Sequence, residues 1–159
     1  MEKLMELAIK KLETRGVMID DIALITKNTQ SIYQDITIEE CRNMVLSIIS
    51  KRETIYTILT GIALDEAAEK NILDPEINQL INEDDGLYGL DEILALSIVN
   101  MNGSIALTNF GYLDKTKPGI IGVIDEEGKS GERCHTFLDD IVCAIAASAA
   151  SRIAHSIKK

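Results

Sequence analysis

Apolar residues recur every three or four positions along most of the chain, which is the spacing of one face of an α-helix. Thr37 and Glu40 add a clear start signal, because a threonine followed three residues later by a glutamate forms a capping box. Gly61 marks a candidate kink in the fourth helix. Periodicity and capping together predict helices over residues 1–14, 20–33, 37–50, 51–70, 74–82, 87–101, 104–116 and 136–157.

The last part of the chain departs from this pattern in two ways. Residues 120–135 combine short β-branched pieces with a glycine-containing turn, and we predict a loop there. Residues 141–150 are apolar or small on every side, so the helix that contains them should be buried on all faces. No segment alternates as a strand does. We therefore predict an all-α fold: one domain over residues 1–159, a bundle of about seven or eight helices around a buried central helix.

Composition narrows the class of protein. A length of 159 residues with 46% hydrophobic content fits one globular domain with a substantial core. The longest strictly apolar run, residues 141–147, is far shorter than the ~20 residues that a membrane-spanning helix needs. The N-terminal residues lack the layout of a signal peptide. We expect a cytoplasmic protein without a transmembrane segment, and peripheral contact with a membrane stays open.

The net charge of −10 disfavours binding to nucleic acid or to anionic bilayers, since both need clusters of lysine and arginine. An anionic substrate would also be repelled unless a metal reversed the local field. The three cysteines, Cys41, Cys134 and Cys143, show no C-x-x-C spacing, so we expect buried, inert thiols. The pair Cys134 and His135 lacks further partners at zinc-ligand spacing.

Five acidic residues lie near predicted helix ends beside apolar runs: Asp91, Glu92, Asp114, Asp139 and Asp140. Such carboxylates are costly unless they hold a cation or cap a helix. Asp91 and Asp114 lie on either side of the turn at 102–103. A tight turn would place both about 17 Å from it, at one end of a helix hairpin. Lys117, held by Pro118, is the convincing anion-binding lysine nearby.

A structural role accounts for part of this set. Thr136 and Asp139 have the spacing of a capping box, and acids in a first helical turn suit the helix dipole. However, carboxylates from different helices are also the hard oxygen ligands that Mg²⁺ and Mn²⁺ prefer. Together with Lys117, the grouping predicts a magnesium site, or a manganese site, that acts on a phosphate.

Three short segments resemble the phosphatidylglycerophosphatase A family, and specifically its soluble, YutG-like branch. They are DEILA at 91–95, FGYLDKTKP at 110–118 and FLDDIV at 137–142. The resemblance implies magnesium-dependent hydrolysis of the phosphate monoester of phosphatidylglycerophosphate, which gives phosphatidylglycerol. It also implies that the metal is held by Asp91, Glu92, Asp114, Asp139 and Asp140. Among these, catalytic roles fall to Asp91, Asp114 and Asp140, and Lys117 would contact the phosphate.

Several alternatives remain at this level. The nucleophile could be water or an aspartate. The expected partner is a phosphorylated small molecule or a lipid head group, and the Ala- and Ser-rich last helix could form a homo-oligomer interface. The chain could instead be a non-catalytic, oligomeric helical module that binds a metal or a protein partner. An all-α nucleotide pyrophosphohydrolase needs two E-x-x-E/D pairs; Glu66 and Glu69 supply one, but Ala95 breaks the second.

Overall fold

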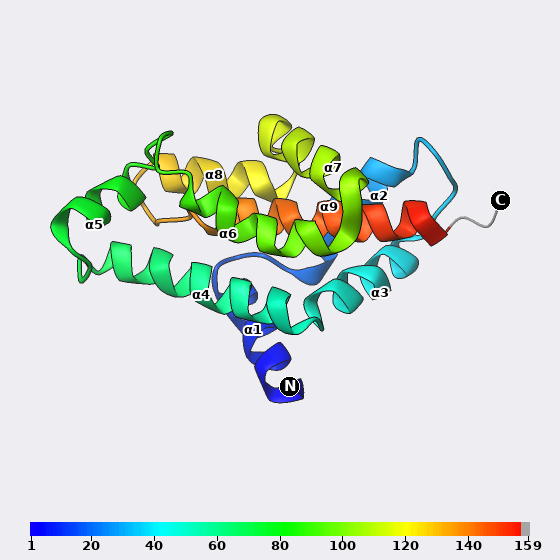
Figure 1. The fold of residues 1–159 in the computed structure, drawn as a ribbon, viewed down its shortest axis with the longest axis horizontal. Helices are drawn as coiled ribbons and strands as arrows, with labels where there is room; N and C mark the ends of the chain where they lie inside the picture. Colours follow the sequence, from blue (N-terminus) through cyan, green and yellow to red (C-terminus); the bar gives the residue numbers. More distant parts are fainter. Residues whose placement is uncertain (157–159) are drawn as a thin grey trace.

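The computed structural model describes residues 1–156 and contains nine α-helices, one short 3₁₀ helix and no strand in that range (Figure 1). The elements are α1 (Glu2–Thr14), α2 (Ile19–Gln30), α3 (Ile38–Ile49), α4 (Arg52–Glu69), α5 (Pro75–Asn82), α6 (Leu90–Val99), η1 (Asn100–Asn102), α7 (Gly103–Thr116), α8 (Ile120–Lys129) and α9 (Leu138–Ser156). The predicted all-α fold is confirmed, and all eight predicted helices are present with shifted ends. Ile157, the predicted last residue of the final helix, lies outside the described residues.

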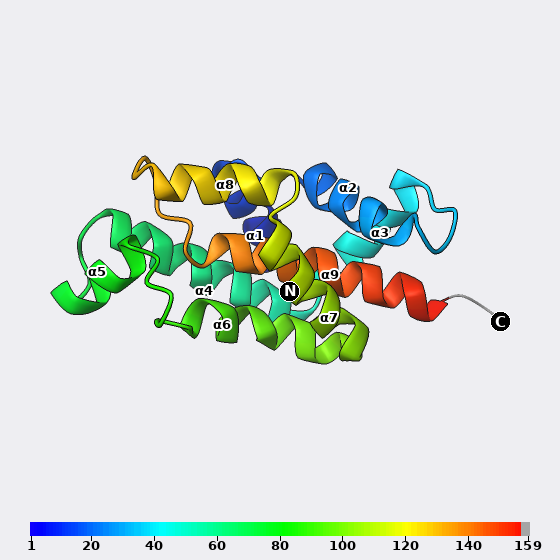
Figure 2. The same cartoon turned by 90° about the horizontal axis from the view of Figure 1, so that it is seen from above.

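The buried central helix is α9, as the sequence predicts. Every residue from 138 to 151 is buried, and α2, α3, α4, α6, α7 and α8 all contact this helix. Figure 2 shows α9 between α8 and α2 on one side and α4 and α6 on the other. Alanine and serine dominate residues 144–151, and such small side chains let the surrounding backbones come close.

The prediction of a loop over residues 120–135 is wrong for its first two thirds, because residues 120–129 form α8. Ile120, Ile121 and Ile124 have helical spacing, and the last two are buried in the core. The sequence does not indicate this helix clearly, because Gly122 and Gly128 interrupt its helical pattern. A side chain at Gly122 would bring its Cβ to 2.7 Å from the carbonyl oxygen of Lys117, so glycine is needed there for close approach.

Gly61 does not kink its helix, contrary to the sequence expectation, because α4 runs unbroken from Arg52 to Glu69. A Cβ at Gly61 would lie 2.3 Å from Cδ1 of Ile141 and 3.2 Å from Cβ of Phe137. The glycine therefore lets α4 pack closely against the beginning of α9. The predicted capping box of α3 is confirmed: Thr37 Oγ1 accepts from the Glu40 amide at 3.2 Å.

The stretch Leu90–Thr116 is long and apolar enough to cross a membrane, by length and composition alone. Uncharged polar residues interrupt its middle and charged residues lie near both of its ends, so a search for strictly apolar runs misses it. Only 33% of its most apolar window is buried. However, η1 divides it into α6 and α7, and both helices pack along α9, as core helices of a bundle do.

Candidate active site

The predicted acidic residues converge on one cavity of about 580 Å³, where α6 begins, α7 ends and α9 begins. The cavity is lined by Asp84, Asp85, Gly86, Asp91, Glu92, Gly111, Asp114, Lys115, Lys117, Asp125, Lys129, Asp139 and Asp140. Asp91 and Asp114 share it, as the hairpin argument expects. Yet α6 and α7 contact α9 more extensively than each other, so α9 rather than a tight hairpin aligns their ends.

Three of the carboxylates form a compact group. One oxygen each from Asp114, Asp139 and Asp140 lies within 4.8 Å of the other two. Asp114 comes from the last turn of α7 and is partly exposed, whereas Asp139 and Asp140 are buried in the first turn of α9. Carboxylates this close repel one another unless protons or cations neutralise them.

The ammonium group of Lys117 lies against this group of carboxylates and contacts two of them. It donates to Asp114 Oδ1 at 2.8 Å and to Asp139 Oδ2 at 2.7 Å. Lys117 ends α7 in the left-handed conformation, with φ of 47°, and its amide donates to the Leu113 carbonyl. Pro118 follows and cannot continue the helix. Burial alone would lower the pKa of Lys117. The charge of Asp139 and the hydrogen bonds to Asp114 and Asp139 outweigh this effect, so the pKa of Lys117 is raised above its ordinary value.

The two buried carboxyl groups at the start of α9, Asp139 and Asp140, hold their protons more tightly than free aspartate does. Burial raises the pKa of Asp139 to about 6 despite the charge of Lys117. Burial, followed by the charges of Asp139 and Asp114, raises the pKa of Asp140 well above its usual range. A divalent cation would remove this penalty, because it favours the charged form of each ligand.

Asp91 and Glu92 border the same cavity from the start of α6 but do not belong to the compact group. Asp91 is 7% exposed, and its Oδ1 atom is buried without a hydrogen-bond partner. Burial and then the neighbouring Glu92 raise its pKa to about 7. A buried carboxylate oxygen without a partner is costly, and its position in an acidic cavity fits a cation or an ordered water. The donor set therefore fits Mg²⁺ or Mn²⁺.

Sequence reasoning missed five further charged residues of the cavity: Asp84, Asp85, Lys115, Asp125 and Lys129. Asp84 lies in the turn before α6 with φ of 50°, and the charge of Asp84 helps to raise the pKa of Asp139. Asp125 accepts from Lys129 at 2.6 Å within α8. Asp125 and Lys129 give no signal because the sequence predicts a loop over residues 120–135, and Asp84 lies in a segment whose sequence indicates only a polar turn.

The predicted capping box at the start of α9 is wrong. The Asp139 amide donates to the His135 carbonyl at 3.2 Å and not to Thr136, whose hydroxyl instead donates to the Ile81 carbonyl at 2.5 Å. Asp65 of α4 caps it instead: its two carboxylate oxygens accept from the amides of Phe137 and Leu138 at 3.0 Å each. Burial raises the pKa of Asp65 to about 8, and these amides oppose the shift.

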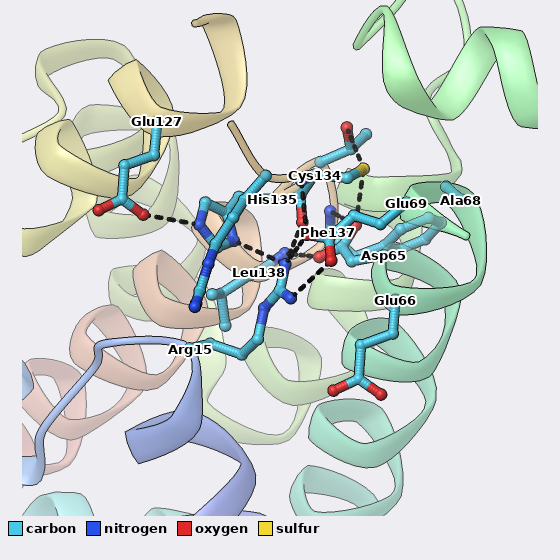
Figure 3. Close-up of polar contacts among 12 residues, drawn as sticks. Arg15, Asp65, Glu66, Ala68, Glu69, Glu127, Cys134, His135, Phe137 and Leu138 are labelled. Atoms are coloured by element: carbon cyan, nitrogen blue, oxygen red, sulfur yellow. Dashed lines mark hydrogen bonds and ion pairs between the residues drawn. The ribbon is translucent and has the colours of Figure 1, made fainter. Parts of the chain in front are cut away.

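A second polar network fixes the segment that leads into α9 (Figure 3). Arg15 forms two hydrogen bonds to Glu69, at 3.1 and 2.5 Å, and one to the Cys134 carbonyl. It also contacts Nδ1 of His135 at 3.3 Å, so this nitrogen accepts. Nε2 of His135 then donates to Glu127 at 2.9 Å. Burial lowers the pKa of His135, which keeps the ring neutral in this role.

The glutamate pair and the cysteines that the sequence singled out all lie in structural surroundings outside the acidic cavity. Glu66 pairs with Lys11 at 2.9 Å, and Glu69 pairs with Arg15, so this helical pair lies apart from the acidic cavity. That arrangement gives no support to a pyrophosphohydrolase site. All three cysteines are buried and free, as expected. Burial raises the pKa of Cys134 to about 11, so its thiol remains a hydrogen-bond donor.

The acidic cavity lies within a region of the chain that matches a known protein family. The model of the family described as phosphatidylglycerophosphatase A matches residues 37–155, which include every residue of the acidic cavity. The uncharacterised Bacillus subtilis protein YpjQ is 50% identical over 157 residues, covering 98% of this chain and 87% of YpjQ. YutG of the same organism, also uncharacterised, is 49% identical over 146 residues, covering 91% and 87%.

A solved structure shares the whole architecture. The crystal structure of the low temperature requirement C protein from Listeria monocytogenes superposes with a TM-score of 0.93 at 51% identity, covering 96% of each chain. The family match over most of the chain and the close similarity to YpjQ and YutG lead to one conclusion: the chain belongs to the phosphatidylglycerophosphatase A family.

Proposed function

We propose that this protein is a magnesium-dependent phosphatase that hydrolyses a phosphate monoester. The observation that carries the proposal is the group of Asp114, Asp139 and Asp140, with three carboxylate oxygens within 4.8 Å of one another. Family membership supports the same class of reaction, since phosphatidylglycerophosphatase A denotes a phosphate-releasing enzyme.

The residues of the cavity fit a divalent cation. Asp114, Asp139 and Asp140 would hold it, with Asp91 and Glu92 bordering the same space. When bound, Mg²⁺ supplies Lewis-acid polarisation of the phosphoryl oxygens and stabilises a deprotonated water. The unpartnered oxygen of Asp91 and its pKa of about 7 suit a group that orients water and accepts its proton.

Lys117 would bind a phosphoryl oxygen of the substrate. Its ammonium already lies at the edge of the carboxylate group, and the left-handed backbone with Pro118 behind it fixes where the side chain begins. As a point charge, lysine binds phosphate without a strict geometric requirement. The protein side of the reaction thus consists of ligand carboxylates, one proton acceptor and one phosphate-binding cation.

The substrate we propose is phosphatidylglycerophosphate, presented at a membrane surface and converted to phosphatidylglycerol. Leu87, 96% exposed, and Leu90, 51% exposed, adjoin Gly86 and Asp91 of the cavity wall. Exposed apolar side chains beside a polar site favour a substrate with an apolar part. We further propose that the protein is cytoplasmic and contacts the membrane only peripherally.

Phosphate release from phosphatidylglycerophosphate in mixed micelles, with Mg²⁺ or with EDTA, tests the proposal. We expect release only with the metal, and a loss of about 100-fold or more in Asp91→Asn, since general-base catalysis contributes at least that factor. Asp35→Asn, which changes an exposed acid outside the cavity, is the matched control and should keep full activity.

The alternative is a non-catalytic module that binds metal. Saturable Mn²⁺ binding without any metal-dependent phosphate release, from the lipid or from simple phosphomonoesters, would contradict the enzymatic proposal and favour that alternative. Equal activity of Asp91→Asn and the native protein would contradict the role of the cavity.

A further inference from the structure

Asp65 is the most completely buried carboxylate of the described residues, with 0% of its surface exposed. It lies on α4, outside the acidic cavity, and no predicted catalytic role includes it. Burying a carboxylate is expensive unless its oxygens are satisfied, so such a residue persists only where its contacts matter. Its contacts converge on one place, the beginning of α9.

Both oxygens of Asp65 bind the backbone immediately before the metal-site acids. Oδ1 accepts from the Phe137 amide and Oδ2 from the Leu138 amide, each at 3.0 Å. The Cys134 thiol adds a longer contact of 3.6 Å to Oδ1. Asp139 follows Leu138 directly. The cap therefore comes from a different helix, and it fixes the position of the first turn of α9 relative to α4.

Close packing reinforces the same junction. Gly61, one turn before Asp65, allows Phe137 and Ile141 to approach the α4 backbone. Arg15 holds the Cys134 carbonyl and also places positive charge near Asp65 (Figure 3). A ligand pair on the first turn of a helix moves whenever that turn frays, since terminal amides otherwise have no intrahelical partners.

We infer that Asp65 is a positioning residue: by accepting from the Phe137 and Leu138 amides, it holds Asp139 and Asp140 in the geometry that binds the cation. The inference rests on the proposed metal-dependent function and extends it to a residue outside the cavity. Groups that orient metal ligands from outside typically change metal affinity 10–100-fold when they are replaced.

The test compares Asp65→Asn with Val45→Ala, a destabilising control. The asparagine keeps the shape of the side chain but turns its amide group toward one of the two backbone donors, so one hydrogen bond is lost. Val45 is fully buried on α3, and the neighbouring Met44 shares a cavity with Ile153 at the far end of α9. Mn²⁺ affinity is measured by electron paramagnetic resonance, and hydrogen exchange is measured at the amides of residues 137–140.

We expect Asp65→Asn to weaken Mn²⁺ binding 10–100-fold and to accelerate exchange at residues 137–140. Val45→Ala should lower the melting temperature with little effect on either quantity. Should Asp65→Asn fail to fold, Asp65→Glu, which keeps both acceptor oxygens one methylene further out, takes its place in the same measurements.

Each outcome decides the inference. Unchanged exchange at residues 137–140 would show that Asp65 does not hold the turn. Faster exchange with native-like Mn²⁺ affinity would show a purely structural cap and leave the proposed function intact. If the native protein binds no Mn²⁺, both the inference and the proposed function are wrong, whereas a loss confined to Asp65→Asn supports both.

Discussion

Lys117 is the residue that most directly controls the charge of the carboxylate group in the cavity. Its ammonium bridges Asp114 and Asp139, so its single positive charge offsets part of the negative charge of two of the three carboxylates that would hold a metal. A side chain in this position has two effects: it stabilises the protein in the absence of metal, and it competes with an incoming cation for the same oxygens. Substrate binding would then draw the ammonium toward the phosphate.

Replacing Lys117 by glutamine should therefore separate metal binding from turnover. We expect Mn²⁺ affinity to rise by about tenfold, equivalent to about 1.4 kcal/mol, because a competing positive charge is lost. Phosphate release should fall, since the phosphate-binding cation is gone. Titration calorimetry with Mn²⁺ and an activity assay on the same preparation measure both quantities. Weaker Mn²⁺ binding in Lys117→Gln would contradict the competition.

The raised carboxyl pKa values predict a pH dependence with a definite sign. Asp91, at about 7, and Asp139, at about 6, keep protons in the folded protein that the unfolded chain has already released. Their contribution to stability is complete below the unfolded pKa near 4 and is lost as the pH rises through the folded values. In EDTA, the melting temperature should fall between pH 5 and pH 7.5.

A saturating concentration of Mg²⁺ should reverse this fall, and its stabilising effect should be larger at pH 7.5 than at pH 5, because binding displaces those protons. Thermal melts at four pH values, with EDTA or Mg²⁺, measure both trends. A melting temperature in EDTA that stays level or rises over this range would contradict the assignment of raised pKa values.

Among the elements, α9 combines two roles, because the helix that forms the centre of the core also begins with Asp139 and Asp140. Its first turn is fixed by α4 through Asp65 and by the close approach at Gly61. Core packing and site geometry are therefore coupled at this end. Changes to α4 should affect the site although α4 contributes nothing to the cavity wall.

Two glycine substitutions measure this packing directly. Gly61→Ala should destabilise the protein by about 1–2 kcal/mol, because overpacking costs about 1–3 kcal/mol and outweighs the better helix propensity of alanine. Gly111→Ala in α7, with nothing within 4 Å of the new Cβ, should stabilise it by about 0.5–1 kcal/mol. Urea unfolding measures both. A stabilising Gly61→Ala would show that α4 and α9 are not in close contact.

The same junction shows what the sequence can and cannot predict. The helical pattern predicts the buried α9, and the acids at 91–92, 114 and 139–140 are predicted to meet because they lie at helix ends. Asp65 gives no such signal, since its partners lie 72 and 73 residues away and a lone acid within a helix looks solvated. The helix α8 was missed because the pattern of its few apolar residues is short and interrupted by Gly122 and Gly128.

For the whole molecule, the distribution of charge is the informative feature. The net charge is −10, yet residues 93–113 carry no charged side chain at all. Much of this stretch is at the surface, including Ile93, Met101, Ile105, Leu107 and Tyr112. Strongly acidic chains repel one another, so a contact between copies is most favourable where neither face carries charge. Residues 138–151 of α9 are buried within the bundle, so the Ala- and Ser-rich last helix does not form the interface that its sequence suggests. We therefore expect homo-oligomers that associate through α6 and α7 instead.

Replacing Ile93, which is 61% exposed, by glutamate should dissociate such an oligomer, because each contact would then bury a carboxylate. Ile72→Glu, at an apolar position after α4 that is 70% exposed, is the matched control and should leave the assembly intact. Light scattering after size exclusion gives the mass of each. A native protein that remains monomeric at high micromolar concentration would contradict the expectation.

The central claim is that Asp114, Asp139 and Asp140 together bind a divalent cation. A crystal soaked in Mn²⁺ and measured at the manganese absorption edge tests it most directly. The account predicts an anomalous peak about 2.0–2.2 Å from oxygens of these three residues, the distance for a small, hard divalent ion. No peak in the cavity at saturating Mn²⁺, or a peak only at other acids of the surface, would contradict it.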